Sequence, residues 1–245
     1  MWIYRDSGAD FADISARKVC CNLKKEMNLK EVCKLIDHTL LRPEATESDI
    51  KGLVREAIEF GFWSCCVNHC WVKLVSHELK GTGIKVCSVV GFPFGTTLSK
   101  ADETAKCVAN GVDEIDMVIN IGFLKSGLYQ RVKDDIHEVV MAADRRLVKV
   151  ILETCVLTRE EKIRGCELAI EAGAGFVKTS TGFAQGGATI EDVKLLREIV
   201  GPNVGVKASG GIRTWEQVVK FVEAGANRIG TSVGVEIVRK IRGRC

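Results

Sequence analysis

The chain has 245 residues, of which 46% are hydrophobic and 27% are charged. This length and composition suit one large α/β domain or two small ones, and they argue against a disordered chain. The formal net charge of +3 is too small to indicate nucleic-acid binding, whereas it is compatible with a small anionic ligand.

The eleven cysteines do not indicate secretion. The chain begins MWIYRDSGADF, which has charges at Arg5, Asp6 and Asp10 and no apolar signal core. Nothing approaches the roughly 18 consecutive apolar residues of a membrane span. We therefore expect a cytoplasmic protein without a membrane segment, in which most cysteines are reduced core residues. Whether any of them form disulfides stays open.

Residues 1–30 are expected to form a mostly helical extension ahead of the first strand. After it, one unit recurs eight times: a run rich in β-branched residues, a loop and an amphipathic stretch. The runs that predict strands are Lys34–Thr39, Phe62–Asn68, Ile84–Phe92, Glu114–Asn120, Leu147–Thr154, Gly175–Ser180, Asn203–Ser209 and Asn227–Thr231.

The stretches between these runs are typical of helices. The clearest is Thr46–Phe60, which begins with TESD, close to a capping box, and is followed by Gly61. Strands that alternate with helices form a parallel sheet, and eight such units predict a closed (β/α)8 barrel, also called a TIM barrel. An open doubly wound sheet is the alternative, although no GxGxxG follows the first strand. We expect residues 31–245 to form this single catalytic domain.

Side chains alternate along a strand, so every second residue of a barrel strand faces the axis. If the apolar residues of each run pack outward, Asp116, Lys149, Lys178 and Lys207 face inward. Lys178 and Lys207 lie near the carboxyl ends of adjacent strands, where barrel active sites form.

Two close ammonium groups and desolvation both favour the loss of a lysine proton. A neutral lysine is a nucleophile that forms a Schiff base with a carbonyl substrate, and Lys178 is the candidate. The alternative is that Lys178 is the cation of a buried ion pair with Asp116 or Glu153, in a phosphate-binding barrel without activity. For Lys149 we expect a structural ion pair.

Small residues and glycines follow the last three predicted strands, in the segments 180–189, 207–214 and 229–234. Barrels commonly hold phosphate at this position, on backbone N–H groups near helix starts, although ordinary turns use the same residues. The segment CCVNHC invites a zinc interpretation. It lacks a CxxC, however, and alternation sends Cys65 and Cys66 to opposite faces, so we expect no metal site.

These residues resemble the deoxyribose-phosphate aldolase family of class I aldolases. The resemblance rests on motifs in the same order along the chain, namely LIDHTLLRPEAT (Leu35–Thr46), CCVNHCWV (Cys65–Val72), VVGFPFG (Val89–Gly95), DEIDMVIN (Asp113–Asn120), KVILET (Lys149–Thr154), FVKTSTGF (Phe176–Phe183), GVKASGGIRT (Gly205–Thr214) and RIGTS (Arg228–Ser232).

The resemblance implies reversible cleavage of 2-deoxy-D-ribose 5-phosphate to D-glyceraldehyde 3-phosphate and acetaldehyde, without a metal or other cofactor. It implies that Lys178 forms the Schiff base, that Lys207 perturbs it and assists proton transfer, and that Asp116 is the acid/base residue. The substrate-binding positions that it implies are Asp37, Thr39, Cys66, Thr181, Gly182, Gly210, Gly211, Arg213, Gly230 and Ser232. It also implies a homo-oligomer, a dimer or tetramer, with phosphorylated sugar and aldehydes as its ligands and no nucleic-acid partner.

The sequence departs from the family pattern at three places. Val233 stands where relatives often have a second serine, and Phe183 stands where some members have lysine. The chain ends RKIRGRC, without the terminal tyrosine that assists proton transfer in some members. We therefore expect an active aldolase whose rate or phosphate preference differs from those members.

Overall fold

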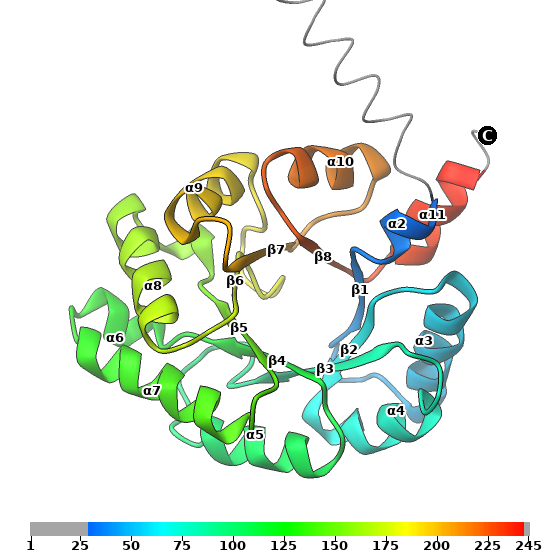
Figure 1. Ribbon diagram of the computed structural model, residues 1–245, viewed down its shortest axis with the longest axis horizontal. Coiled ribbons are helices and arrows are strands. Elements are labelled where there is room, and N and C mark those ends of the chain that lie inside the picture. Colours follow the sequence, from blue (N-terminus) through cyan, green and yellow to red (C-terminus); the bar gives the residue numbers. More distant parts are fainter. Residues whose placement is uncertain (1–28, 243–245) are drawn as a thin grey trace, which may run out of the picture.

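The computed structural model describes residues 29–242, which contain a closed barrel of parallel strands in the order β1 to β8. Viewed down the barrel, the strands form the inner ring and the helices surround it (Figure 1). The predicted (β/α)8 barrel is confirmed, and the open doubly wound sheet is wrong. Of the predicted extension, residues 1–28 lie outside the described part of the chain. The strands are β1 (Ile36–Leu40), β2 (Ser64–Asn68), β3 (Lys85–Val90), β4 (Glu114–Val118), β5 (Leu147–Ile151), β6 (Phe176–Lys178), β7 (Gly205–Ser209) and β8 (Arg228–Thr231).

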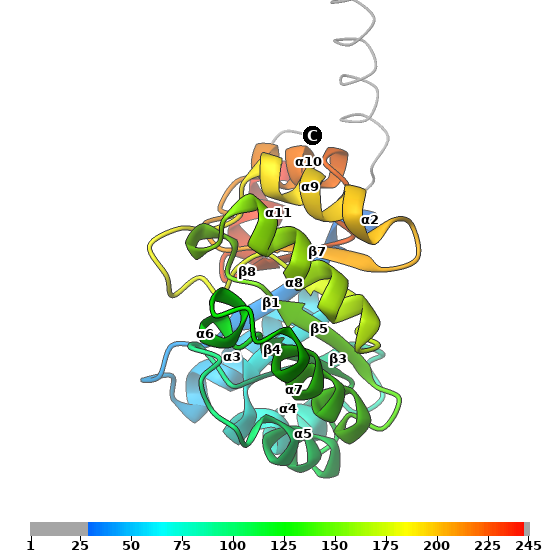
Figure 2. The same cartoon turned by 90° about the vertical axis from the view of Figure 1, so that its left-hand side faces the viewer.

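The helices pack side by side around the outside of the strand ring, as the side view also shows (Figure 2). None of the described helices is long and apolar enough to cross a bilayer. They are α2 (Leu29–Cys33), α3 (Glu47–Phe60), α4 (Val72–Glu78), α5 (Lys100–Ala109), α6 (Ile121–Lys125), α7 (Tyr129–Ala142), α8 (Arg159–Glu171), α9 (Ile190–Val200), α10 (Trp215–Glu223) and α11 (Gly234–Arg242), with the short 3₁₀ helices His69–Trp71 and Thr154–Val156.

Helix α3 begins and ends where the sequence predicts. Thr46 and Asp49 form a capping box in which each side chain binds the other residue's backbone N–H, so two of the unpaired donors at the helix start are satisfied. Gly61 ends the helix with φ +67°, a left-handed conformation that glycine adopts without steric cost.

The predicted alternation of side chains is confirmed. Outward residues such as Ile115, Met117 and Val150 join the large apolar core between strands and helices. Cys65 belongs to that core, whereas Cys66 points inward with Cys87, Val89 and Phe92. The barrel interior therefore holds a small apolar cluster on the β1–β3 side together with buried charged side chains such as Asp116 and Lys207.

The predicted runs are longer than the strands, and β3 and β5 show why. Strand β3 ends at Val90 because Gly91 turns the chain with φ +61°. Strand β5 ends at Ile151, and Glu153 takes a left-handed conformation with φ +59°, which is uncommon for a residue other than glycine. Glu153 thus leaves the strand alternation, and its side chain bonds to the loop that follows β6.

Candidate active site

Asp116 lies at the centre of the barrel interior and contacts all three inward lysines. Its Oδ1 accepts a hydrogen bond from Lys149 Nζ at 2.8 Å. Its Oδ2 accepts from Lys178 Nζ at 2.9 Å and from Lys207 Nζ at 2.7 Å. The side chain of Asp116 is fully buried, and those of the lysines are at most 3% exposed. One carboxylate of β4 thus joins cations from β5, β6 and β7.

Strand register brings the two predicted catalytic lysines together. Lys178 on β6 is the direct partner of Lys207 on β7. Asp116 is the partner of Lys149 on the neighbouring strand. Because parallel neighbours lie about 4.8 Å apart, residues at the same level of adjacent strands face the same space. Both lysines reach the same carboxylate oxygen for this reason.

A second layer of ion pairs lies toward the amino ends of the strands. Lys207 Nζ also pairs with Asp37 Oδ2 at 2.5 Å, and Asp37 Oδ1 accepts from Arg228 at 2.9 Å. Glu114 binds Lys149 at 2.6 Å and Arg228 at 3.2 Å. These seven side chains form what we call the interior charge network: Asp37, Glu114, Asp116, Lys149, Lys178, Lys207 and Arg228.

The network holds four cationic side chains and three carboxylates, so full ionisation leaves one positive charge in excess. Lys149 and Lys207 each contact two carboxylates, whereas Lys178 contacts only Asp116 among the described ion pairs. The excess charge is therefore least compensated at Lys178. The contacts of Lys149 with Glu114 and Asp116 agree with the structural ion pair predicted for it.

The pKa directions follow from these contacts. Burial alone would raise the pKa of Asp116, but Lys149, Lys178 and Lys207 hold it well below its ordinary value. Burial would lower the pKa of Lys207, but Asp116 and Asp37 raise it above the ordinary range. The pKa of Lys149 is raised well above its usual value for the same reason, against burial, chiefly by Asp116. Asp116 is thus ionised, and Lys149 and Lys207 keep their protons at neutral pH.

A cavity of about 320 Å³ opens above Lys178, and we call it the lysine cavity. Its walls come from the loops that follow β1, β6, β7 and β8. It brings together eight of the predicted substrate-binding residues with Lys178, namely Thr39, Thr181, Gly182, Gly210, Gly211, Arg213, Gly230 and Ser232. The cavity is also lined by Arg42, Phe183, Ser209 and Thr231, which were not among the predicted substrate-binding residues.

Two predicted substrate-binding residues, Asp37 and Cys66, do not line this cavity. Asp37 is fully buried, binds Lys207 and Arg228, and accepts a hydrogen bond from Ser64 at 2.7 Å. Cys66 is fully buried and is paired in register with Cys87. A hydrogen bond with Cys87 lowers the pKa of the Cys66 thiol, against the effect of burial. Neither residue lines the cavity; Asp37 instead holds Lys207, and Cys66 packs with Cys87 and Val89.

Glu153 is a further residue that organises the site. Its carboxylate is buried and accepts hydrogen bonds from the backbone N–H of Thr181, at 3.2 Å, and from the Thr181 hydroxyl. The Thr181 hydroxyl in turn accepts from the backbone N–H of Phe183 at 3.0 Å. The left-handed backbone of Glu153 therefore aims a carboxylate at the loop after β6. The sequence shows that residue 153 is a glutamate, but strand alternation directs its side chain toward the barrel axis. The contact of Glu153 with the loop after β6 could therefore not be predicted.

The structure also answers the metal hypothesis raised by the segment CCVNHC. Cys65 and Cys66 point to opposite sides of β2, as predicted, and His69 and Cys70 are exposed beyond the strand. Ligand atoms of Cys66, Cys87 and Asp116 do lie within 4.8 Å of one another. However, Asp116 already accepts hydrogen bonds from three ammonium groups, which supply the positive charge that a cation would bring.

Fold and site together define a class of protein. A buried lysine that opens into a cavity at the carboxyl end of a closed barrel, beside a carboxylate and a second lysine, has the groups needed for Schiff-base chemistry on a carbonyl compound. Glycine-rich loops at the opposite wall of the cavity can take a phosphate.

Comparisons with known proteins identify the family. Residues 31–241 match the family described as DeoC/LacD family aldolase. The curated deoxyribose-phosphate aldolase of Caldanaerobacter subterraneus subsp. tengcongensis is 57% identical over 223 residues, which cover 89% of this chain and 96% of the relative. The deoxyribose-phosphate aldolase of Streptococcus equi subsp. zooepidemicus is 57% identical over 208 residues, covering 84% of this chain and 94% of the relative.

Solved structures agree. A putative deoxyribose-phosphate aldolase from Coccidioides immitis superposes with a TM-score of 0.86 at 39% identity, covering 95% of this chain and 99% of that one. A deoxyribose phosphate aldolase from Aeropyrum pernix, described as a unique tetrameric structure, gives 0.85 at 33% identity, covering 94% and 99%. The chain belongs to the DeoC/LacD aldolase family, and it is therefore an aldolase, a carbon–carbon lyase.

Proposed function

We propose that the chain catalyses the reversible cleavage of 2-deoxy-D-ribose 5-phosphate to D-glyceraldehyde 3-phosphate and acetaldehyde. The observation that carries this proposal is the position of Lys178, whose side chain opens into the lysine cavity while its ammonium group contacts Asp116. The curated relatives, at 57% identity over most of the chain, carry the name of this activity.

Lys178 is the nucleophile in this proposal. Of the three interior lysines, only Lys178 lines the cavity, and its charge has the fewest carboxylate contacts. Loss of its proton removes the excess positive charge of the interior network. The free amine attacks the C1 aldehyde of the open-chain sugar, and loss of water from the resulting carbinolamine gives an iminium.

Asp116 and Lys207 move protons in the next step. The iminium withdraws electrons from the C2–C3 bond, and a base removes the C3 hydroxyl proton as that bond breaks. Asp116, acting through a bound water and Lys207, is the base, because both groups lie within hydrogen-bond distance of each other beside Lys178. The bond electrons form an enamine. Protonation of its carbon and hydrolysis release acetaldehyde and restore Lys178. Such acid/base assistance contributes about 10²–10⁴-fold.

The loops after β6, β7 and β8 hold the phosphate in this proposal. Gly210 and Gly211, after β7, have φ +93° and +77°, a region that other residues rarely adopt. Arg213 lies in the same loop, and its backbone N–H is bound to Gln217 Oε1 at 2.8 Å, so the loop is fixed to helix α10. Gly230 and Ser232 precede helix α11, whose amino end favours an anion.

We further propose a cytoplasmic homo-oligomer. The support for assembly is the Aeropyrum pernix relative, which is described as a tetramer. The support for a reducing compartment is that the eight cysteines within residues 29–242 are all free thiols. Size-exclusion chromatography with light scattering tests the assembly.

The decisive experiment is intact-mass analysis after incubation with acetaldehyde and borohydride. We expect wild type to gain one ethyl group, and we expect Lys178→Leu to gain none. Lys100→Leu is the matched control, because Lys100 is also buried but pairs with Asp135 of helix α7, away from the cavity. This control should gain the ethyl group. A folded wild type without an adduct would leave the alternative, a phosphate-binding barrel in which Lys178 only forms an ion pair.

A further inference from the structure

A buried carboxylate that does not belong to the interior charge network lies beside the lysine cavity. Glu153 follows β5 and is only 3% exposed. The groups that bond to its carboxylate within residues 29–242 are all uncharged, namely the backbone N–H and hydroxyl of Thr181 and, at 3.9 Å, the thiol of Cys155. Buried carboxylates are usually paired with a cation, because burial of an unpaired charge costs free energy. The position of Glu153 is therefore costly for folding.

The backbone at Glu153 adds a second cost. Its φ of +59° and ψ of +62° lie in the left-handed region, which residues with a Cβ adopt only at a cost. Two other residues in the described part of the chain that are not glycine have positive φ, Asp144 and Arg145, and both are exposed. Glu153 alone combines this conformation with burial, and strain that persists beside an active site points to a role for the side chain.

The carboxylate of Glu153 occupies both hydrogen-bond donors of Thr181. A threonine can donate from its backbone N–H and from its hydroxyl, and the hydroxyl oxygen has two lone pairs. Both donors bond to Glu153, the N–H at 3.2 Å. One lone pair accepts the backbone N–H of Phe183 at 3.0 Å. Thr181, which lines the lysine cavity, is thus left with one free lone pair and no free hydrogen.

Other hydrogen bonds hold the chain that leads to Thr181. The Thr179 carbonyl accepts from the backbone N–H of Thr154 at 2.9 Å, and the Thr179 hydroxyl donates to the Ser209 carbonyl at 3.0 Å. The Ser209 hydroxyl donates to the Ser180 carbonyl at 2.6 Å. The path of the chain up to residue 180 is therefore fixed by contacts in which the Glu153 carboxylate takes no part.

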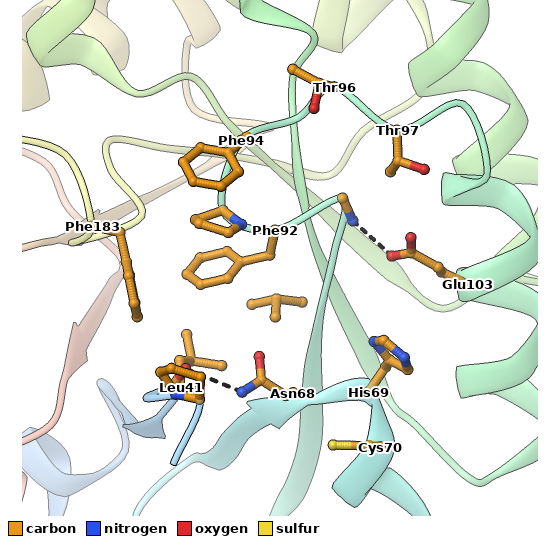
Figure 3. Close-up of a pocket in the computed structure, with 14 residues that line it drawn as sticks. Leu41, Asn68, His69, Cys70, Phe92, Phe94, Thr96, Thr97, Glu103 and Phe183 are labelled. Atoms are coloured by element: carbon orange, nitrogen blue, oxygen red, sulfur yellow. Dashed lines mark hydrogen bonds between the residues drawn. The ribbon is translucent and has the colours of Figure 1, made fainter. Parts of the chain in front are cut away.

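The loop is also held on the far side of Thr181. The ring of Phe183 packs edge to face on Phe92, with ring centroids 5.1 Å apart, at a second cavity of the barrel mouth that both rings line (Figure 3). Because the loop is held at both ends, its course does not depend on Glu153 alone. The direction of the Thr181 hydroxyl hydrogen, in contrast, is set by the Glu153 carboxylate.

We propose that Glu153 is a positioning residue that makes Thr181 a hydrogen-bond acceptor toward the substrate. The proposal rests on the aldolase function proposed above. Glu153 does not line the lysine cavity, so it acts through Thr181. The oxygens of an ionised phosphate only accept hydrogen bonds, whereas a sugar hydroxyl also donates. Thr181 therefore accepts a hydrogen bond from a hydroxyl of the sugar chain and gives none to the phosphate.

Glu153→Gln reverses this polarity with little change in size. The amide has one acceptor oxygen and one NH₂ group, so it cannot accept from both donors of Thr181. When its oxygen accepts the Thr181 N–H, its NH₂ donates to the Thr181 hydroxyl oxygen, which already accepts from Phe183. Both lone pairs are then occupied, and only the hydroxyl hydrogen is free. Thr181→Val removes the hydroxyl and keeps the branched shape and the backbone N–H.

The test makes two measurements on wild type, on Glu153→Gln, on Thr181→Val and on the double variant. They are KM for 2-deoxy-D-ribose 5-phosphate and the rate of modification by acetaldehyde and borohydride. Acetaldehyde has no hydroxyl, so its reaction reports on the fold and on Lys178 without the contact to Thr181. Glu161→Gln is the matched control, because Glu161 also accepts a threonine N–H, that of Thr158 at 2.8 Å, but lies on helix α8 and lines neither cavity.

We expect KM to rise about threefold to tenfold in each single variant, as for the loss of one hydrogen bond. The double variant should show no further rise, because both changes remove the same contact. The modification rate should stay within about twofold of wild type throughout, and Glu161→Gln should match wild type in both measurements. An unchanged KM in Glu153→Gln, effects that multiply in the double variant, or a modification rate that falls as far as KM rises overturns the proposal. Failure of wild type to cleave 2-deoxy-D-ribose 5-phosphate overturns the proposed aldolase function as well.

Discussion

Replacement of Lys149 by methionine separates the structural lysine from the proposed catalytic one. Methionine keeps an unbranched chain but removes the ammonium group that lies 2.6 Å from Glu114 and 2.8 Å from Asp116. Removal of one partner of a buried pair typically destabilises a protein by about 3–5 kcal/mol. Here the lower end applies, because Glu114 keeps Arg228 and Asp116 keeps Lys178 and Lys207. We expect a loss of about 3 kcal/mol, or about 6–12 °C in Tm for a domain of this size.

Urea unfolding measures this loss, and the acetaldehyde–borohydride reaction measures the chemistry. Lys149→Met should still be modified at Lys178, but more slowly at pH 7, because loss of one cation removes the excess charge of the interior network. In the double variant with Glu114→Gln, the total destabilisation should be smaller than the sum of the two single losses by about 1–3 kcal/mol. If the free energy of unfolding of Lys149→Met alone lies within 0.5 kcal/mol of the wild-type value, as is typical of substitutions at surface positions, Lys149 does not belong to the network.

Three further predictions concern stability, pH and the phosphate. Gly95→Ala should lower the free energy of unfolding by about 1–3 kcal/mol in urea, because Gly95 has φ +72° and an added Cβ would collide with the backbone carbonyl of Ile119; an unchanged midpoint would contradict this. Burial would raise the pKa of Asp37, but Lys207 and other cations hold this pKa below its ordinary value of about 3.9. The stability that ionised Asp37 contributes is therefore complete above about pH 3.9 and is lost as the pH falls further. The stability difference between wild type and Asp37→Asn should thus be constant from pH 7 to pH 5 and shrink toward pH 3. A difference that grows on acidification would contradict a lowered pKa for Asp37. Arg213→Ala should raise KM for 2-deoxy-D-ribose 5-phosphate about tenfold or more, while KM for unphosphorylated deoxyribose stays the same; equal effects on both sugars would remove Arg213 from the phosphate site.

Local backbone geometry explains why much of the fold could be predicted. Two-residue alternation is a property of a single strand, so the inward direction of Asp116, Lys178 and Lys207 follows from their own runs of sequence. Helix boundaries such as Thr46 and Gly61 are also local, because a cap needs only residues within one turn. The repeated unit then places each strand beside the next one in the chain. The only point left open is whether the sheet closes into a barrel.

The partners across the barrel could not be predicted in the same way. Arg228 shares the inward face of its run with Gly230, but its contact with Glu114 depends on barrel closure, which brings β8 within reach of β4. The count of charges inside the barrel depends on that closure as well. The contact of Phe183 with Phe92 depends on two loops whose conformations have no sequence period. For this reason the second cavity at the barrel mouth, which both rings line, could not be predicted.

Two cavities lie at the barrel mouth, the lysine cavity and a second one lined by Phe92 and Phe94, and both include Leu41 and Phe183 in their walls. Beyond the loops that carry these two shared residues, the second cavity takes its walls from the loops after β2 and β3, and the lysine cavity takes its walls from the loops after β7 and β8. Substitutions in residues 92–97 therefore alter one half of the barrel mouth and leave the glycine loops after β7 and β8 in place. Lys178 and Asp116 stand on strands beneath both halves and need not move when either changes. The two halves of the barrel mouth are consequently separable in this molecule, and natural variation or laboratory selection can adjust them one at a time.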